Sequence, residues 1–360
     1  MNEKLNKIMS QFDVDARFEN YGNGHINDTY ISRPNEYILQ KINTSIFTDP
    51  KGLMDNIDNV TSFLRKKIVV KGGNPARETL TVIKTIDGKN YYEFNGDAFR
   101  MYKFVEDTIT IESVEDSTDM YRAGRGFGKF QALLDDYPAE TLNETIVDFH
   151  NTVKRLENLE IAIAKDKSGR ASSVTDEIEF CRQRADVANT VVREMEKETV
   201  PVRVTHNDTK INNILFDAKT REAVCVIDLD TVMPGCALYD FGDALRIGAS
   251  TAAEDETDLS KVHFNVENFK AFAKGYLEET AKLLTKKEVE LLAFSAKLLT
   301  FECGMRFLTD HIDGDTYFKI HRENHNLDRA RNQFKLVMEI EAIESDLNKI
   351  IEDIYNELTQ

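Results

Sequence analysis

The sequence predicts an α+β protein in two parts: a small N-terminal antiparallel sheet with a helix, and a larger, mostly helical C-terminal part. Three observations predict this. Runs of β-branched and aromatic residues separated by turn residues fill the first hundred positions. After about residue 107, apolar residues recur every three or four positions. A length of 360 residues suggests roughly two domains of about 150 residues each. We therefore expect one domain over 1–106 and a second over 107–360, joined by a short hinge near Val105.

The N-terminal part reads as strands joined by turns, with one helix between them. Arg33-Pro34-Asn35-Glu36 predicts the turn of a first hairpin, and Asp87-Gly88 predicts the turn of a second. Leu53, Ile57, Val60 and Leu64 are spaced as on one face of a helix. The expected strands are 29–32, 37–42, 79–85, 90–94 and 99–105, and the expected helix is 50–67.

The C-terminal part shows helical periodicity in long segments and only short strand-like runs. The expected helices are 176–197, 266–284, 287–308 and 327–358, and the expected strands are 202–204, 213–216 and 223–227. Gly124, Gly126 and Gly128 imitate a glycine-rich loop, but they lead into an apolar run at 130–134. We therefore predict that these glycines lie on a helix-packing face.

Composition excludes several classes of function. A formal net charge of −17 disfavours nucleic acid and anionic lipid as main partners, because both require a basic face. No apolar run approaches the roughly 20 residues of a membrane span, and the first residues lack an apolar signal-peptide core. These features predict a cytoplasmic location. The four cysteines are scattered without a C-x-x-C pair, so we expect small buried side chains rather than a zinc site or disulfides.

A polar segment at 206–213, His-Asn-Asp-Thr-Lys-Ile-Asn-Asn, stands between two apolar runs and carries the strongest chemical signal. A surface turn is the ordinary explanation. The segment Val226-Ile227-Asp228 downstream favours another one, because phosphoryl transfer needs an Asp for the attacking hydroxyl, an Asn and a second Asp for a metal, and a cation. Asp208 is the candidate base, and Asn213 and Asp228 are the candidate metal ligands. Lys210 is placed to reach the γ-phosphate.

The spacing supports this interpretation. Asn213 follows Asp208 by five positions, as the Asn of the protein-kinase catalytic loop follows its catalytic Asp. Asp230 shares a strand face with Asp228, and it either binds the metal as well or orients the first ligand through outer-shell bonds. Asp240-Phe241-Gly242 imitates the kinase D-F-G motif. We expect Asp240 to be structural, accepting backbone N–H bonds that brace the catalytic loop.

A second candidate phosphate site precedes the first hairpin. Gly22 and Gly24 would let a turn approach the phosphates of a nucleotide closely, and a plain hairpin turn is the alternative. Asn27 stands where a third kinase-type glycine would be, and no helix follows, which excludes a Rossmann loop.

Taken together, these motifs resemble the N-acetylhexosamine 1-kinases of the aminoglycoside phosphotransferase superfamily, and the resemblance covers nearly the whole chain. The catalytic motif is shared with choline, homoserine, fructosamine and methylthioribose kinases, whereas the blocks at 43–47 and 302–308 are narrower. The matching segments are 21–27, 37–40, 43–47, 205–213, 227–231, 233–235, 240–243, 259–264 and 302–308.

The resemblance implies a bilobal protein-kinase-like fold that holds ATP and Mg²⁺ and phosphorylates the anomeric hydroxyl of N-acetylglucosamine or N-acetylgalactosamine. It implies that Asp208 is the base and that Asn213 and Asp228 bind Mg²⁺. The residues implied at the nucleotide are Gly22, Gly24, Gln40 and the hinge residues Phe104 and Val105. The residues implied at the sugar are His25, Arg306 and Tyr317, for which a loop position, a helix ion pair and a core position are the respective alternatives.

One position departs from kinases at large. Gln40 stands where the strand-three lysine would be, and only Asp58 is available as its acidic partner on the following helix. Lys41 is adjacent, but strand alternation points it to the other face. Either Gln40 contacts the phosphates as a neutral donor, with Lys210 and Mg²⁺ supplying charge, or the chain is a weak or inactive kinase.

Two rival functions follow from these observations. The same fold could phosphorylate choline, homoserine or an aminoglycoside, for which a carboxylate-lined pocket would be expected. A nucleotide-binding scaffold without catalysis is the other rival, motivated by Gln40. The preferred epimer and the oligomeric state do not follow from the sequence.

Overall fold

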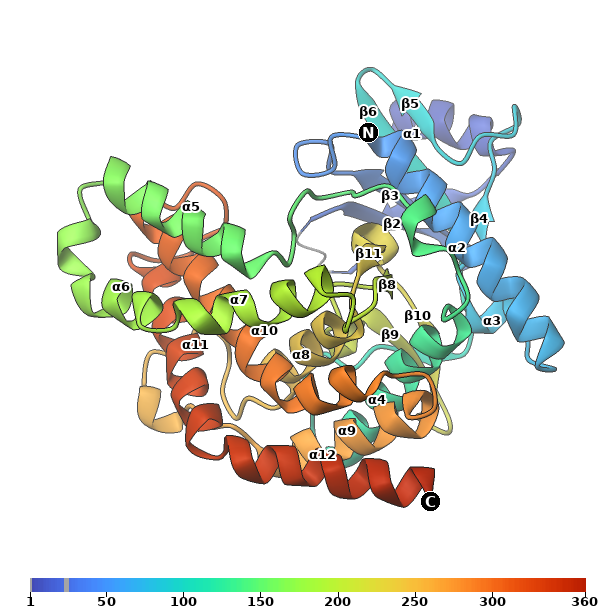
Figure 1. The fold of residues 1–360 in the computed structure, drawn as a ribbon. Coiled ribbons are helices and arrows are strands. Elements are labelled where there is room, and N and C mark those ends of the chain that lie inside the picture. The colour runs from blue at the N-terminus through green and yellow to red at the C-terminus, as the bar shows by residue number, and fades with distance from the viewer. Residues whose placement is uncertain (1, 23–25) are drawn as a thin grey trace. The chain divides into compact units, whose positions relative to one another are not determined.

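The computed structural model describes residues 2–22 and 26–360, apart from the side chains of residues 2–4. The chain forms two compact units, each discontinuous in sequence (Figure 1). The first unit comprises Met1–Ile111, Leu133–Val147 and Asn212–Pro234, and the second comprises Glu112–Ala132, Asp148–Ile211 and Gly235–Gln360. An antiparallel sheet in the N-terminal part and a helical C-terminal part confirm the predicted α+β class. The division into lobes at residue 106 stays a prediction.

The sheet of the first unit has six strands among the described residues, in the order β1-β2-β3-β6-β4, with β5 also paired to β6. The predicted hairpin between β2 and β3 is confirmed, with Tyr30 opposite Leu39. The strands are β1 (Arg17–Asn20), β2 (Asp28–Arg33), β3 (Tyr37–Ile42), β4 (Val82–Ile83), β5 (Tyr92–Phe94) and β6 (Asp97–Lys103).

The second predicted hairpin is only partly right. The turn at Asp87-Gly88 forms, because the Thr85 N–H donates to the Lys89 carbonyl at 2.9 Å. However, β4 and β5 each pair with β6 and not with each other. The tight turn between paired strands is Asn95-Gly96, whose φ angles of 54° and 83° suit a two-residue hairpin loop. The longer strand β6 provides the pairing edge that both short strands use.

Helix α2 (Pro50–Val70) confirms the predicted helix at 50–67. Asp49 caps its start by accepting from the Gly52 N–H at 3.0 Å, and Pro50 occupies a first-turn position where a missing N–H costs nothing. A second short helix, α3 (Pro75–Glu78), follows it. Helix α1 (Asn2–Met9) and the turn after it place Ile8 and Phe12 against Leu39 of β3.

The first unit also contains a small sheet of β7 (Thr108–Ile109), β9 (Ile214–Asp217) and β10 (Ala223–Val226), in the order β10-β9-β7. Strands β9 and β10 form an antiparallel hairpin with Val226 opposite Ile214. Both strands agree with the predicted runs at 213–216 and 223–227. The short strand β11 (Met233–Gly235) follows along the chain.

The second unit is helical, as predicted. Two expected helices are each divided in two: 176–197 breaks at Gln183-Arg184, and 327–358 breaks at Ile343. The sequence predicted one helix in each case because the apolar periodicity continues across these breaks of one or two residues. The helices are α4 (Ser117–Leu133), α5 (Thr152–Lys165), α6 (Thr175–Arg182), α7 (Ala185–Glu196), α8 (Ala237–Gly248), α9 (Val266–Thr280), α10 (Lys286–Asp313), α11 (His325–Ala342) and α12 (Glu344–Thr359). No helix within the described ranges is long and apolar enough to cross a membrane.

Glycines allow helices α4 and α9 to pack closely. A Cβ at Gly124 would lie 2.3 Å from the Phe272 carbonyl oxygen, and one at Gly128 would lie 2.8 Å from the Tyr276 carbonyl oxygen. The predicted helix-packing role is therefore confirmed for Gly124 and Gly128. All four cysteines are buried as free thiols, which is also as predicted.

Candidate active site

The segment His206–Lys210 follows strand β8 (Arg203–Thr205) and is held in place by a carboxylate. Asp240, in the first turn of α8, accepts the backbone N–H groups of His206 at 2.9 Å and Asn207 at 2.7 Å. The predicted role of Asp240 as a brace of this loop is confirmed. Asp243 accepts the Thr209 N–H at 2.8 Å, so two acidic residues of α8 hold three backbone N–H groups of the loop.

The Asp240-Phe241-Gly242 motif is helical in this protein. Phe241 is fully buried and its ring lies 5.4 Å from that of Phe272. A Cβ at Gly242 would lie 2.3 Å from the carbonyl oxygen of Ser295 in α10, so the glycine permits close helix packing. This use of the motif is structural, as predicted for Asp240.

Asp208 and Lys210 lie side by side in the loop. The Lys210 Nζ atom is 3.0 Å from an Asp208 carboxylate oxygen, and the two side chains are 35% and 22% exposed respectively. Asn207 precedes Asp208 with a φ of 64°, a left-handed conformation that Asn tolerates better than most residues. This turn leaves a carboxylate and an ammonium group together at a partly exposed position.

A buried histidine supports the same loop from behind. His150 Nε2 lies 3.0 Å from the carbonyl oxygen of Asn207, and its Nδ1 lies 2.8 Å from the Glu302 carboxylate. Thr152 donates its hydroxyl to the other Glu302 oxygen at 2.6 Å. His150 is not among the predicted site residues, because nothing in the local pattern distinguishes it, although Glu302 begins the block at 302–308 that the family resemblance includes.

These contacts shift the pKa values of the buried groups. Burial disfavours the charged form of His150, but the Glu302 carboxylate outweighs burial and raises the His150 pKa. Burial likewise opposes ionisation of Glu302, and His150 more than offsets it, so the Glu302 pKa is lowered. Each partner therefore favours the charged form of the other, next to the Asn207 carbonyl.

In the first unit, Asn213 and Asp228 lie at the same end of the β9–β10 hairpin. The Ile227 N–H donates to the Asn213 carbonyl at 2.9 Å, and Asp228 is the next residue after Ile227. An amide oxygen and a carboxylate are the oxygen ligands that Mg²⁺ prefers, so these two residues fit that ion. The described residues contain no group of three or more His, Cys, Asp and Glu side chains that could hold a metal by themselves.

Asp230 is engaged by protein groups. Its carboxylate accepts from the Asn27 amide at 2.7 Å and forms an ion pair with the buried guanidinium of Arg100. Both carboxylate oxygens therefore have partners, which favours the positioning role among the two alternatives considered for Asp230.

Arg100 supplies the cation that is absent at Gln40. The two residues are opposite each other on β6 and β3, and Arg100 Nε donates to the Gln40 amide oxygen at 2.9 Å. Burial lowers the Arg100 pKa, but Asp230, Tyr102 and Asp228 outweigh it and raise that pKa. Arg100 is not among the predicted site residues, although a charged residue between Phe99 and Met101 in an apolar strand was a usable signal.

The remaining predictions around Gln40 concern Lys41, Asp58 and a contact with phosphates. Lys41 points away from Gln40, as predicted, and pairs with Asp97 at 2.9 Å. Asp58 pairs with Lys84 at 2.5 Å. The Gln40 amide donates to the Thr29 hydroxyl at 3.1 Å. The expected contact of Gln40 with phosphates stays a prediction.

The other expected nucleotide residues are only partly described. Gly22 has a φ of 71°, as a tight turn requires, whereas Gly24 and His25 lie outside the described residues. The Phe104 N–H donates to the Glu36 carbonyl at 2.7 Å, and the Val105 carbonyl accepts from the Thr108 hydroxyl at 2.9 Å. Contacts of these residues with a nucleotide stay predictions.

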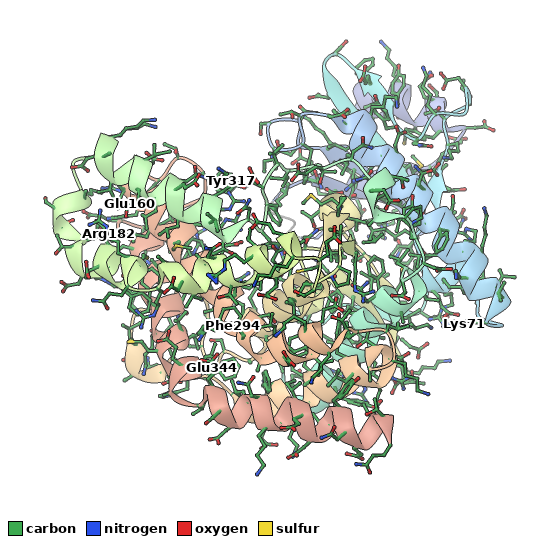
Figure 2. All side chains as sticks on the ribbon, in the orientation of Figure 1. Lys71, Glu160, Arg182, Phe294, Tyr317 and Glu344 are labelled. Atoms are coloured by element: carbon green, nitrogen blue, oxygen red, sulfur yellow. The ribbon has the colours of Figure 1, made fainter. Side chains whose placement is uncertain are left out.

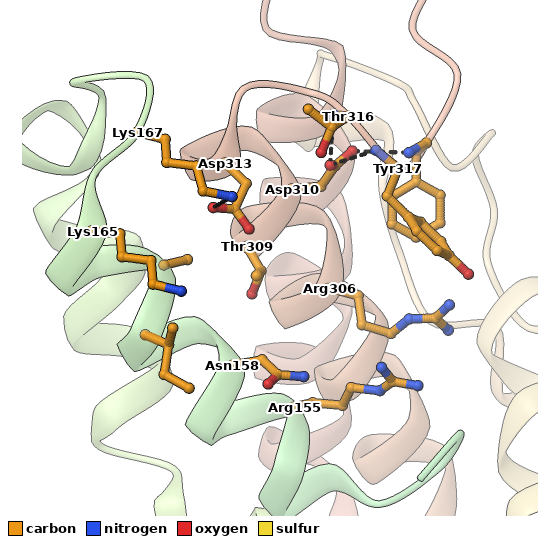
Figure 3. A pocket seen from close by; sticks show the side chains of 13 residues that line it. Arg155, Asn158, Lys165, Lys167, Arg306, Thr309, Asp310, Asp313, Thr316 and Tyr317 are labelled. Carbon is orange, nitrogen blue, oxygen red and sulfur yellow. Dashed lines mark hydrogen bonds and ion pairs between the residues drawn. The ribbon is translucent and has the colours of Figure 1, made fainter. Parts of the chain in front are cut away.

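Arg306 and Tyr317 line one cavity of the second unit, of about 340 Å³, between α5 and the C-terminal half of α10 (Figure 3). Tyr317, labelled in Figure 2, is 59% exposed, so the alternative of a core position is wrong. Among the described residues, Arg306 forms no ion pair, which also removes the helix ion pair as its explanation.

The cavity is cationic although the chain is strongly acidic. Four of the residues that line it are basic and two are acidic. The acidic residues are already engaged: Asp310 accepts the backbone N–H groups of 316, 317 and 318, and Asp313 pairs with Lys167 at 3.6 Å. The basic residues are Arg155, Lys165, Lys167 and Arg306.

Comparison with known proteins places these observations in a family. The model of the phosphotransferase enzyme family matches residues 17–272. Among solved structures, a microcompartment-associated aminopropanol kinase is similar over 97% of this chain and 99% of its own, with a TM-score of 0.62 and 15% identity. An aminoglycoside phosphotransferase from Alicyclobacillus acidocaldarius is similar over 97% and 96%, with a TM-score of 0.62 and 12% identity. A choline kinase from Cryptosporidium parvum is similar over 96% and 98%, with a TM-score of 0.59 and 13% identity.

Proposed function

The chain belongs to the phosphotransferase enzyme family, and we propose that it transfers the γ-phosphate of ATP to the anomeric hydroxyl of N-acetylglucosamine or N-acetylgalactosamine. The observation that carries this choice of acceptor is the cationic cavity around Arg306 and Tyr317. Choline and aminoglycosides are cations and would be repelled there. A neutral amide sugar accepts hydrogen bonds from a guanidinium group and can pack on an aromatic ring.

In this proposal Asp208 orients and deprotonates the acceptor hydroxyl, and the Lys210 ammonium beside it offsets the charge that develops on the transferred group. Asn213 and Asp228 would hold Mg²⁺, which neutralises phosphate charge when it is bound. His150 and Asp240 keep the loop around Asp208 in one conformation through the Asn207 carbonyl and the backbone N–H groups.

The test is ADP release from ATP and Mg²⁺ with a panel of acceptors: N-acetylglucosamine, N-acetylgalactosamine, glucose, choline, homoserine and kanamycin. We expect turnover with the two N-acetylhexosamines, with the product carrying phosphate at the anomeric carbon. Turnover on choline or kanamycin alone would reject the proposed acceptor. ATP binding without ADP release on any acceptor would favour the non-catalytic scaffold.

The Asp208→Asn variant tests the chemistry directly. It removes the positioned base and keeps the side-chain shape, so we expect kcat to fall by about two to four decades while ATP still binds. Rapid-quench measurement of sugar phosphate, together with a nucleotide-binding titration, separates the two effects. Unchanged kcat in this variant would remove Asp208 from the mechanism.

A further inference from the structure

Two guanidinium groups of the α5–α10 cavity form no salt bridge among the described residues, and the Glu302 and Asp148 carboxylates act on Arg155 only through their charge. Arg155 of α5 donates through Nε and Nη2 to the carbonyl oxygen of Phe149, at 3.2 and 2.5 Å. The guanidinium carbon of Arg306 lies 5.3 Å from the ring centre of Phe149 and 5.6 Å from that of Phe318. Figure 3 shows both guanidinium groups beside each other, on the side of the cavity where Tyr317 lies.

The acidic residues that line the cavity do not neutralise this pair. Asp310 is buried and accepts from three backbone N–H groups and, at 2.8 Å, from the Asn326 amide. Asp313 pairs with Lys167, whose position in Figure 3 is on the opposite side of the cavity from the two arginines. The positive charge of Arg155 and Arg306 is therefore directed to the cavity without a counterion from its lining.

This arrangement is unfavourable without a ligand. Burial and the neighbouring Arg306 lower the Arg155 pKa and outweigh the opposite effect of Glu302 and Asp148, so the charged form is destabilised where it lies. The acetamido oxygen of a neutral sugar needs only one guanidinium group as a donor. The second cation is more than a neutral acceptor requires, whereas two adjacent guanidinium groups match the several oxygens of a carboxylate or phosphate.

We propose that Arg155 and Arg306 form an oxyanion site, so that the acceptors of this pocket include N-acetylhexosamines that carry a phosphate or carboxylate away from the anomeric carbon. Two contacts link the cavity to the catalytic loop. Arg155 donates to the Phe149 carbonyl, and the next residue, His150, contacts the Asn207 carbonyl. The identity of the sugar rests on the proposed function, but binding of the oxyanion does not.

The experiment is isothermal titration calorimetry on the full chain at constant ionic strength with three probes: inorganic phosphate, N-acetylglucosamine 6-phosphate and N-acetylglucosamine. We expect the sugar phosphate to bind more tightly than the neutral sugar. Replacing Arg155 by Gln should weaken phosphate and sugar phosphate by about tenfold to a hundredfold, the range for losing a hydrogen bond to a charged group. The neutral sugar should change much less.

Arg193→Gln provides a matched control, because Arg193 is an exposed residue of α7 that does not line the cavity. It should leave all three affinities unchanged. Arg155→Lys is the second variant: it keeps the charge but loses the planar fork, so we expect an intermediate loss. Thermal melting of each variant verifies that it is folded. If Arg155→Gln does not fold, Arg155→Lys still tests the site.

The outcomes separate the two proposals. If inorganic phosphate binds as tightly as the sugar phosphate and its binding depends on Arg155, the site is supported and its ligand is a free oxyanion. An equal loss in Arg193→Gln, or no effect of either Arg155 variant on the two phosphates, overturns the site. Absence of N-acetylhexosamine turnover together with Arg155-dependent phosphate binding rejects the proposed function and retains the oxyanion site.

Discussion

The chemistry of individual residues in this protein is set by their partners more than by their type. Asp240 is buried and accepts two backbone N–H groups, whereas burial outweighs those bonds and raises its pKa. Asp243 is equally buried, but Arg246, with help from His150 and Lys210, outweighs burial and lowers its pKa. Two acidic residues three positions apart on one helix thus have opposite tendencies to ionise, because only one has an arginine beside it.

The His150–Glu302 pair makes a pH-dependent contribution to stability. Because the His150 pKa is raised in the folded protein, protonated His150 stabilises the fold at pH values below its ordinary pKa of 6.5. This stabilisation is lost as pH rises through the raised pKa. The lowered Glu302 pKa stabilises the fold above the ordinary value of 4.5 and loses effect as pH falls. We therefore expect Glu302→Gln to reduce the free energy of unfolding most at about pH 5.5, by about 3 kcal/mol, and less at alkaline pH.

Urea unfolding of both proteins at pH 5.5, 7.5 and 9 measures this difference. Glu160→Gln is the control, since Glu160 pairs with Arg182 at 2.8 Å in an exposed position (Figure 2) and should matter little at any pH. A loss for Glu302→Gln that is constant from pH 5.5 to 9 would mean that the imidazolium form of His150 does not contribute.

The sequence predicts site residues where a local spacing carries the information. Asp208, Asn213 and Asp228 follow from the catalytic-loop pattern because they lie within about twenty positions of one another. Arg100 and His150 do not, because their partners are far along the chain: Arg100 and Asp230 are 130 positions apart, and His150 and Glu302 are 152 apart. Such pairs become visible only when the fold brings the segments together.

At the scale of elements, close helix packing depends on glycines. Gly124 and Gly128 of α4 face α9, and Gly275 of α9 faces α4, where an added Cβ would lie 2.1 Å from the Tyr121 carbonyl oxygen. The contact is with backbone on both sides, so no side-chain movement can relieve a clash. The α4–α9 crossing therefore tolerates only glycine at these positions.

We expect Gly275→Ala to lower the free energy of unfolding by about 1 to 3 kcal/mol through overpacking. Gly126→Ala is the control on α4, because helix periodicity turns residue 126 away from the face formed by 124 and 128. Its added methyl group should raise stability by about 0.5 to 1 kcal/mol, the helix-propensity gain of Ala over Gly. Denaturant unfolding midpoints of the two variants and the unmodified protein compare their stabilities. An equal change in stability for both substitutions would contradict the packing argument.

Element prediction succeeded where hydrophobic periodicity and turn residues agree, as in the β2–β3 hairpin and helix α2. It was wrong about the pairing of β4 and β5, because Asp87-Gly88 predicts a turn but not which strands pair. The Asn95-Gly96 turn was the stronger signal for that hairpin. Helix breaks at Gln183-Arg184 and Ile343 carry no Gly or Pro, so periodicity alone could not reveal them.

At the scale of the whole molecule, a net charge of −17 contrasts with local sites that need or supply positive charge. Nucleotide and phosphorylated sugar are anions, and the acidic chain repels them at long range. We therefore expect binding to depend on local cations, such as Lys210 and the Arg155–Arg306 pair, and on a metal bound with the nucleotide. We expect the metal to be required for nucleotide binding as well as for transfer.

Thermal unfolding tests that requirement on the intact chain, because a ligand that binds only the folded state stabilises it by about 2.7 kcal/mol at a hundred times its Kd. We expect ATP with Mg²⁺ to raise Tm by several degrees and ATP with excess EDTA to raise it much less. Asp228→Asn should remove most of the Mg²⁺-dependent part, since a carboxylate ligand becomes an amide. The control Asp353→Asn, at an exposed position of α12, should keep all of it. An equal Tm shift with and without Mg²⁺ would show that protein cations alone hold the nucleotide, and would leave Asp228 without the role we assign to it.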